Sequence, residues 1–300
     1  MNEKIITVVG TNASGKSDLG VFLAKKYNAE ILSADSRQIY KGLDLGTGKL
    51  TKDEMQGIKH YMVDILDVNQ PYSVVDFQQQ AYAIIDDIIK RDKLAIIAGG
   101  TGLYTRSVVK GYTFNDVDAN PKLREELEKK TTEELYQQLV DIDPEVAKRN
   151  TKENRRRIIR CLEKYEALGK DGLEDSYEPR YEVLQLGVTW PNDILHERID
   201  ERMQRRFDQG MIEEVETLMK QGASDEFLEN LGLEYRFIHR YLIGEIKSKA
   251  DLYDQLGRAI KRFAKQQKTW FKRDKDIKWL DMSKDYKKEA CLLVDEFLNK

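Results

Sequence analysis

A glycine-rich segment near the start of the chain has the spacing of a phosphate-binding loop. Residues 10–17 read Gly-Thr-Asn-Ala-Ser-Gly-Lys-Ser, which fits the pattern G-x-x-x-x-G-K-[ST]. In such a loop successive backbone N–H groups converge on an anion, and the positive end of the following helix adds to the attraction. Lys16 would reach phosphoryl oxygens, and the Ser17 hydroxyl suits a Mg²⁺ ligand. The predicted site for a nucleotide or pyrophosphate group consists of Gly10, Thr11, Asn12, Ala13, Ser14, Gly15, Lys16 and Ser17.

Two further polar segments follow strand-like runs. Asp35 opens the segment Asp-Ser-Arg-Gln-Ile-Tyr, and Thr101 lies in Gly-Gly-Thr-Gly-Leu-Tyr. Because the carboxyl ends of parallel strands face the ligand crevice, Asp35 could act as a general base, hold a metal-bound water, or cap the next helix. Many NTPases carry an acidic residue where Gly99 and Gly100 stand here, so an ATPase is disfavoured. These glycines would let a ligand approach the backbone closely, or form a plain turn.

A row of arginines is predicted on one face of a helix near residue 200. Arg198 and Arg202 share a face with either Arg205 or Arg206, at the spacing of successive helical turns. Guanidinium groups in such a row could bind pyrophosphate oxygens. The alternative is salt bridging along the same helix, with Glu197, Asp200 and Glu201.

Basic residues gather in two segments, although the formal net charge of the chain is −3. Residues 148–164 carry eight Lys or Arg against two Glu, and residues 258–275 carry eight against one Asp. Such clusters indicate either a local polyanion site or two solvated helix faces. In the second segment Ile260, Phe263 and Trp270 lie opposite the basic face and are expected in the core.

The elements that must position these groups alternate between strands and helices. Strands are predicted at 4–9, 30–34, 61–66 and 93–98, with helices at 16–27 and 72–90, which is typical of a parallel sheet covered on both faces. From 115 to 178 only helical periodicity is present, with a loop at 171–179. Strand-like alternation returns at 181–188, followed by helices at 193–207, 209–220 and 252–271, a strand at 277–280 and a closing helix. The fold class is therefore α/β, with a core of residues 1–114 and 181–300 and a helical insertion domain at 115–180.

Composition narrows the setting of the protein. No apolar run approaches the roughly 20 residues of a membrane span, and no basic, apolar leader precedes the first strand. The two cysteines, Cys161 and Cys291, do not make a disulfide framework, which favours a reducing cytosol. A cytoplasmic monomer without membrane contact is the expectation.

Five motifs taken together resemble one enzyme family. GTNASGKS, DSRQIY, GGTGLY, RRRIIRCLE and AKQQKTWF resemble the tRNA dimethylallyltransferase family, also called isopentenyl-tRNA transferases, in order and spacing over nearly the whole chain. The resemblance implies a P-loop NTPase-like core whose helical insertion grips the anticodon stem-loop of tRNA. It also implies transfer of a dimethylallyl group from dimethylallyl diphosphate to the exocyclic N6 amine of the adenosine 3′ of the anticodon, with Mg²⁺ and with release of diphosphate.

The resemblance also implies roles for single residues. The segment 10–17 would hold diphosphate rather than ATP, and Asp35 would accept the proton of the adenine amine. Thr101 would lie near the reacting adenosine, and Arg202 would contact the diphosphate. The residues implied in tRNA binding are Asp35, Ser36, Arg37, Gln38, Thr101, Arg124, Arg156, Arg157, Ile158, Ile159 and Arg160.

Three positions depart from the family pattern. Thr11 stands where a proline is usual, Gly232-Leu233-Glu234-Tyr235 replaces Gly-Tyr-x-Glu, and Gln266 stands where arginine is usual. Three other readings remain open at this point. They are an adenylate isopentenyltransferase acting on free AMP, ADP or ATP, a P-loop kinase for a small metabolite, and a non-catalytic RNA-binding protein.

Overall fold

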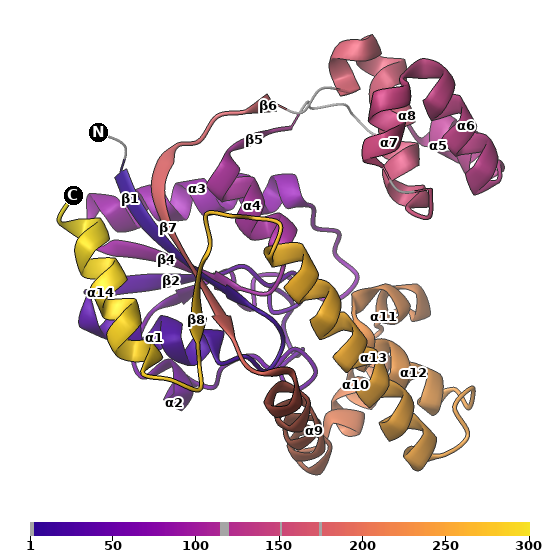
Figure 1. Cartoon of the computed structure of the whole chain (residues 1–300). Coiled ribbons are helices and arrows are strands. Elements are labelled where there is room, and N and C mark those ends of the chain that lie inside the picture. Colours follow the sequence, from indigo (N-terminus) through magenta and orange to yellow (C-terminus); the bar gives the residue numbers. More distant parts are fainter. Residues whose placement is uncertain (1–2, 115–119, 151, 174–175) are drawn as a thin grey trace. The chain divides into compact units, whose positions relative to one another are not determined.

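The chain divides into two compact units. The computed structural model describes residues 3–114, 120–150, 152–173 and 176–300. One unit, here called the core unit, joins Met1–Lys110 with Pro179–Lys300, and the other, the insertion unit, is Gly111–Glu178. Each unit has a hydrophobic core of its own (Figure 1).

A parallel sheet forms the centre of the core unit. Its six strands lie in the order β3-β2-β4-β1-β7-β8 and are all parallel, which confirms the predicted α/β class. Their bounds are β1 Glu3–Gly10, β2 Ala29–Ser33, β3 His60–Tyr61, β4 Leu94–Gly99, β7 Tyr181–Thr189 and β8 Lys278–Asp281. β1 lies between β4 and β7, so the glycine-rich loop that follows it leaves the middle of the sheet.

Helices cover both faces of this sheet (Figure 1). α1 (Lys16–Lys26) and α14 (Tyr286–Leu298) pack on one face, where Ile6 and Val8 of β1 point. α3 (Val74–Lys90) and α4 (Gly102–Lys110) pack on the other, where Ile5 points. Since both faces are covered, the central strands are nearly continuous apolar runs, as their sequences show.

A group of helices builds a second core beside the carboxyl ends of the strands. The group comprises α9 (Asn192–Asp208), α10 (Met211–Lys220), α11 (Asp225–Leu231), α12 (Leu233–Leu242) and α13 (Lys249–Phe271). The sequence reading missed α11 and α12. They are short and meet at a single residue, Gly232, so neither shows a long periodic run.

One predicted strand is largely absent. Of the run 61–66 only Tyr61 belongs to a strand, because Met62 and Asp64 have φ angles of 61° and 55°. Left-handed residues break the strand ladder, and a single bridge between Tyr40 and Leu66 remains. The segment instead follows β3 and leads toward α3. Tyr40, its bridge partner, lies in the long connection from β2 to β3, which also contains the short helix α2 (Lys52–Met55).

Two sets of polar contacts hold the β2–β3 connection in place. Lys49 donates to the Tyr40 carbonyl at 3.1 Å and pairs with the carboxylates of Asp44 and Asp64. Glu214 on α10 accepts the backbone N–H groups of residues 44–46, at distances of 2.7–3.1 Å, and the Tyr235 hydroxyl at 2.8 Å. The segment around residue 46 therefore has a fixed position against α10 and α12.

The insertion unit is mainly helical. It contains α5 (Pro121–Glu128), α6 (Thr132–Ile142), α7 (Pro144–Arg149), α8 (Arg155–Leu168) and a 3₁₀ turn at Gly169–Leu173. A pair of antiparallel strands, β5 (Tyr112–Thr113) and β6 (Ser176–Tyr177), belongs to it as well. This pair explains why the unit begins at 111 and ends at 178, whereas the sequence suggested 115–180 with a loop at 171–179.

Candidate active site

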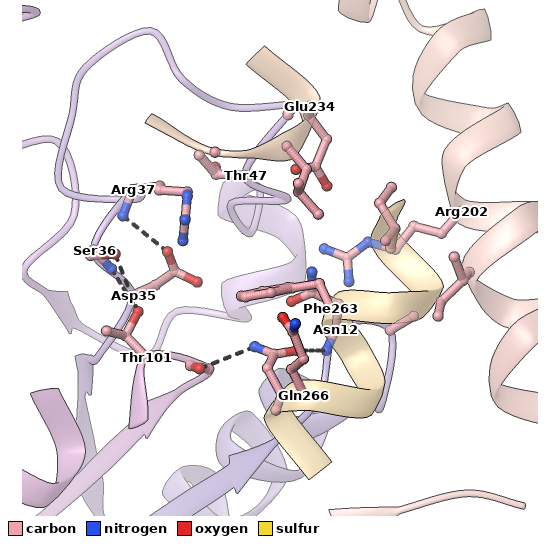
Figure 2. A pocket seen from close by; sticks show the side chains of 18 of the residues that line it. Asn12, Asp35, Ser36, Arg37, Thr47, Thr101, Arg202, Glu234, Phe263 and Gln266 are labelled. Carbon is pink, nitrogen blue, oxygen red and sulfur yellow. Dashed lines mark hydrogen bonds between the residues drawn. The ribbon is translucent and has the colours of Figure 1, made fainter. Parts of the chain in front are cut away.

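A cavity of about 650 Å³ opens where the strands of the core unit end. Its polar side comes from three connections, those that follow β1, β2 and β4. Its apolar side comes from α9, α13 and their neighbours, and includes Ile199, Met203, Met211, Leu233, Ile260 and Phe263. Figure 2 shows the Asp35 carboxylate and the Arg202 guanidinium pointing toward the same space, beside the ring of Phe263. A cavity of this size and mixed lining is typical of a small-molecule site.

The glycine-rich loop has the shape of an anion cradle. Ala13 and Gly15 have φ angles of 58° and 86°, and the Ser14 hydroxyl donates to the Thr11 carbonyl at 2.8 Å. At Gly10 a side chain would collide with Ser14 and Val188, so only glycine fits. α1 begins directly after the loop, at Lys16, so its N–H groups face the cradle.

A buried glutamine of α13 fastens this loop from outside. Gln267 accepts the Asn12 N–H at 3.0 Å and donates to the Gly100 carbonyl at 3.1 Å. It thereby links the ends of β1 and β4. The sequence reading missed Gln267, although a polar residue on the apolar face of the 252–271 helix was a visible signal.

Lys16 carries a positive charge that the protein only partly compensates. Its ammonium group donates to the Thr11 carbonyl at 3.4 Å. Burial first, and then the positive charge of Arg202, lower the pKa of Lys16 to about 8, against partial opposition from Asp35. A desolvated cation of this kind is stabilised by a bound anion.

Asp35 lies in a turn that Thr101 fixes. One Asp35 carboxylate oxygen accepts the Arg37 N–H at 3.0 Å, and no helix begins at this point, so the helix-cap alternative is wrong. The Thr101 hydroxyl accepts the Ser36 N–H at 3.1 Å (Figure 2). Gly99 allows the backbone at the end of β4 to lie close to the Ala34 backbone, with which a side chain at this position would collide. It is therefore needed for packing within the protein rather than for the approach of a ligand.

The arginines of α9 separate into three positions. Arg202 and Arg206 line the cavity, whereas Arg205 is exposed to solvent. Arg198 instead donates to the Ala13 carbonyl at 3.0 Å and lies 4.7 Å from the Trp190 ring centroid, so it supports the loop from outside. Within the described ranges, none of these arginines forms an ion pair with Glu197, Asp200 or Glu201.

Comparison with known proteins decides the family. A family model described as IPP transferase matches residues 38–274. The chain belongs to the IPP transferase family. Similar proteins include a tRNA dimethylallyltransferase of Anoxybacillus flavithermus, 41% identical over 95% of this chain and 92% of the relative. Another, from Carboxydothermus hydrogenoformans, is 42% identical over 95% of this chain and 94% of the relative.

Solved structures agree with this assignment. The tRNA isopentenylpyrophosphate transferase of Bacillus halodurans superposes with a TM-score of 0.76 at 33% identity, over 99% of this chain and 96% of that one. A eukaryotic dimethylallyltransferase acting on tRNA gives a TM-score of 0.81 at 25% identity, over 93% of this chain and 74% of that one. The resemblance inferred from the five motifs is confirmed, and the family is one of prenyl-transferring enzymes rather than of P-loop kinases.

In this IPP transferase the site residues inferred from the DSRQIY motif divide between two places. Asp35, Ser36 and Arg37 line the cavity, and the Arg37 side chain also donates to the Leu231 carbonyl. Gln38 does not line it. Its amide accepts the Ser33 hydroxyl at 2.9 Å and donates to the Gly48 carbonyl at 3.4 Å, beside a separate hollow of about 20 Å³ that Ser17 also lines.

The insertion residues of the RRRIIRCLE motif also divide. Ile158 and Ile159 are 0% and 2% exposed and pack in the core of the insertion unit, so their side chains do not lie at the surface where a tRNA contact was expected. Helical periodicity demands this, since two residues of every turn face inward. Arg156 and Arg157 are exposed. Arg155 and Arg160 are partly exposed.

A buried carboxylate organises two of the expected tRNA-binding arginines. Glu163 is 1% exposed as a side chain and accepts two hydrogen bonds from Arg124, at 2.8 and 3.0 Å, and one from Arg160 at 3.3 Å. Removing one partner of a buried ion pair costs about 3–5 kcal/mol. Arg124 and Arg160 therefore have a structural task in addition to any ligand contact.

The basic face of α13 is partly structural as well. Lys261 pairs with Asp200 at 2.6 Å and Lys268 donates to the Asn192 side chain at 2.9 Å, which ties α13 to α9. On the opposite face Phe263 lines the cavity instead of packing in the core, contrary to expectation. Trp270 also lines the cavity, but it packs against the small core of Val9, Phe271 and Ile277 as well. Both residues are partly exposed, so α13 supplies an aromatic wall to the cavity.

Within the described ranges the helices are all too short or too polar to cross a lipid bilayer.

Proposed function

We propose that this protein transfers a dimethylallyl group from dimethylallyl diphosphate to the exocyclic amine of an adenosine in tRNA. The observation that carries the proposal concerns Lys16, Arg202 and Asp35. Lys16 is buried close enough to the other two for their charges to act on it, and Arg202 and Asp35 line one cavity that also has an apolar wall. The first two groups suit a diphosphate, the third suits a proton acceptor, and the apolar wall suits a branched five-carbon chain. The relatives named tRNA dimethylallyltransferase support the same reaction.

The donor would bind with its diphosphate in the glycine-rich loop. Backbone N–H groups of the loop, the Lys16 ammonium and the Arg202 guanidinium surround the space where its oxygens would lie. Burial, and then the charge of Arg206, lower the pKa of Arg202, which nevertheless keeps its proton at neutral pH. The prenyl chain would lie against Phe263 and its apolar neighbours.

Mg²⁺ fits this arrangement only together with the diphosphate. Among the described residues, no group of three or more His, Cys, Asp or Glu side chains could hold a metal ion. Mg²⁺ is commonly bound by one or two protein oxygens together with substrate phosphates and waters. The Ser17 hydroxyl would be the protein ligand, and the ion would neutralise part of the charge of the leaving group.

The reaction needs a proton acceptor and a stabilised leaving group. The N6 atom would attack the allylic carbon C1, the C1–O bond would break, and diphosphate would leave with the electron pair. The N6 proton would pass to the Asp35 carboxylate, which the turn at Arg37 and Thr101 holds in place. The loop, Lys16 and Arg202 would stabilise the charge that develops on the diphosphate.

tRNA would supply the adenosine from a loop. A base must leave its stack to reach the cavity, and the cost is least in a single-stranded segment such as the anticodon loop. The insertion unit adds a hollow of about 140 Å³ lined by four cationic side chains, Arg149, Arg157, Arg160 and Lys164, which suits phosphate oxygens. Free adenine nucleotides would not need this unit.

A single assay tests the proposal. The protein is given labelled dimethylallyl diphosphate, Mg²⁺, and either an anticodon stem-loop or AMP. Label is expected on the stem-loop and absent from AMP. Label on AMP alone would instead make the protein an adenylate isopentenyltransferase, and phosphate transfer from ATP to a small molecule would make it a kinase.

Pyrophosphate affinity is expected to fall as the pH rises through 8, because Lys16 loses its charge there. A bound anion raises the pKa of Lys16, so binding takes up a proton above this pH, and the affinity falls by at most about tenfold per pH unit. Calorimetric titration between about pH 7 and about pH 9.5 measures this change. A Lys16→Met variant shows how affinity changes with pH through the ionisation of pyrophosphate alone. If affinity changes equally with pH in the variant and in the unsubstituted protein, the role of Lys16 is contradicted.

Arg156 and Arg157 are expected to bind tRNA phosphates. The double variant Arg156→Gln/Arg157→Gln should weaken stem-loop binding and reduce the slope of log K against log salt by about 1.4–1.8. Arg160 is left unchanged because it pairs with Glu163. A matched control, Lys122→Gln/Lys129→Gln, removes the same charge from two exposed positions, one in α5 and one directly after it. Equal slopes for variant and control would show that no specific phosphate contact is lost.

A further inference from the structure

Arg206 is a buried cation whose hydrogen bonds are incomplete. It lies one turn after Arg202 on α9, lines the cavity, and its side chain is 12% exposed. Its Nη1 donates to the Gly46 carbonyl at 3.4 Å and lies 3.7 Å from a Glu234 carboxylate oxygen. Its Nη2 is buried and has no hydrogen-bond partner among the described residues. A buried, unsatisfied N–H donor of a charged group is costly unless a ligand completes it.

The protein holds two guanidinium groups side by side at this point. A side chain at Gly48 would overlap the guanidinium groups of both Arg202 and Arg206, and Gly48 has a φ angle of 63° that favours glycine. This glycine lets both arginines lie against the backbone of the β2–β3 connection, which Glu214 and Lys49 fix in place. Their mutual repulsion contributes to the lowered pKa of Arg202.

We propose that Arg206 is a second guanidinium ligand of the diphosphate, binding a phosphoryl oxygen beside Arg202 while Glu234 holds its other edge. Two adjacent guanidinium groups can bind several oxygens of one diphosphate with charge-assisted hydrogen bonds. This inference rests on the proposed prenyl transfer, and it goes beyond it by assigning Arg206 and Glu234. Glu234 is 12% exposed and keeps Arg206 charged and oriented before the donor binds.

The alternative is a buried ion pair with a purely structural task. The two roles differ in how Arg206 and Glu234 respond to substitution. If the pair is structural, replacing one partner should lower pyrophosphate affinity by disturbing the site, and replacing both partners should restore that affinity. If Arg206 binds diphosphate, its loss should weaken binding whether or not Glu234 is present.

Calorimetry with inorganic pyrophosphate and Mg²⁺ distinguishes these roles. The variants are Arg206→Gln, Glu234→Gln, the double variant, and Arg205→Gln as the control, because Arg205 is the exposed neighbour of the same charge. Arg206→Gln is expected to weaken pyrophosphate binding by about 10- to 100-fold, in the native and in the Glu234→Gln background alike. The same variant should raise the KM for dimethylallyl diphosphate and leave stem-loop affinity within a few-fold of that of the control.

Two results would overturn the assignment. One is an Arg206→Gln affinity equal to that of Arg205→Gln, and the other is native affinity restored in the double variant. The double variant leaves no unpaired charge. If Arg206→Gln alone does not fold, the comparison of the double variant with Glu234→Gln tests the role of Arg206. Failure of the proposed function is separate, because it would appear as absent label transfer by the unsubstituted protein, whatever the pyrophosphate affinities of the variants.

Discussion

Asp35→Asn is expected to reduce dimethylallyl transfer by about 10²- to 10⁴-fold, the usual contribution of a general base. Asparagine keeps an oxygen that can accept the Arg37 N–H, so the turn that carries the residue should persist. Only the capacity to take the proton of the adenine amine is lost. Single-turnover rates with a saturating anticodon stem-loop measure the effect, and stem-loop affinity should stay within a few-fold of the unsubstituted value.

The matched control for this variant is Asp67→Asn. Asp67 lies in the connection from β3 to α3, where its exposed carboxylate pairs with Lys41, a residue of the β2–β3 connection. The control should retain full activity. If Asp35→Asn transfers at nearly the rate of the control, Asp35 is not the base, and its carboxylate merely shapes the turn.

Lys16→Ala is expected to reduce kcat for transfer by about 10²- to 10³-fold, comparable to the loss of one donor from a preorganised oxyanion site. Lys16 is a buried charge in the glycine-rich loop, where the proposed leaving group would bind, and its burial makes water a poor replacement. Pyrophosphate affinity should fall with the rate, since the same interaction binds the product. Lys25→Ala, an exposed position on the same helix, provides the control.

The result to look for is a change in both quantities for Lys16 and in neither for Lys25. A Lys16 variant with native pyrophosphate affinity would show that the loop backbone and the arginines suffice, and would place Lys16 outside the diphosphate site.

Local motifs made the polar half of the site predictable. The loop 10–17, Asp35 and Thr101 each follow a buried strand, and parallel strands bring their carboxyl ends to one edge. That these three segments lie close together could therefore be predicted from the sequence, without knowledge of any long-range contact. The choice between Arg205 and Arg206 stayed open, because it depends on how α9 packs against the β2–β3 connection.

Residues that act through distant contacts were not predictable in the same way. Gln267 meets Asn12 across 255 positions of the chain, and no local pattern announces the pair. Glu214 binds three backbone N–H groups of a connection about 170 residues earlier. Ile158 and Ile159 show the opposite error, since a motif match assigned ligand contact to positions that helical periodicity alone would have placed in the core.

The bond between Gln267 and Asn12 also has a consequence for motion. The Asn12 amide proton belongs to a loop, yet it donates to a side chain of α13, so its exchange with solvent requires this contact with α13 to open. The same helix supplies Phe263 to the apolar wall of the cavity. A fluctuation that moves α13 away from the sheet would therefore disturb the glycine-rich loop and the apolar wall of the cavity at the same time.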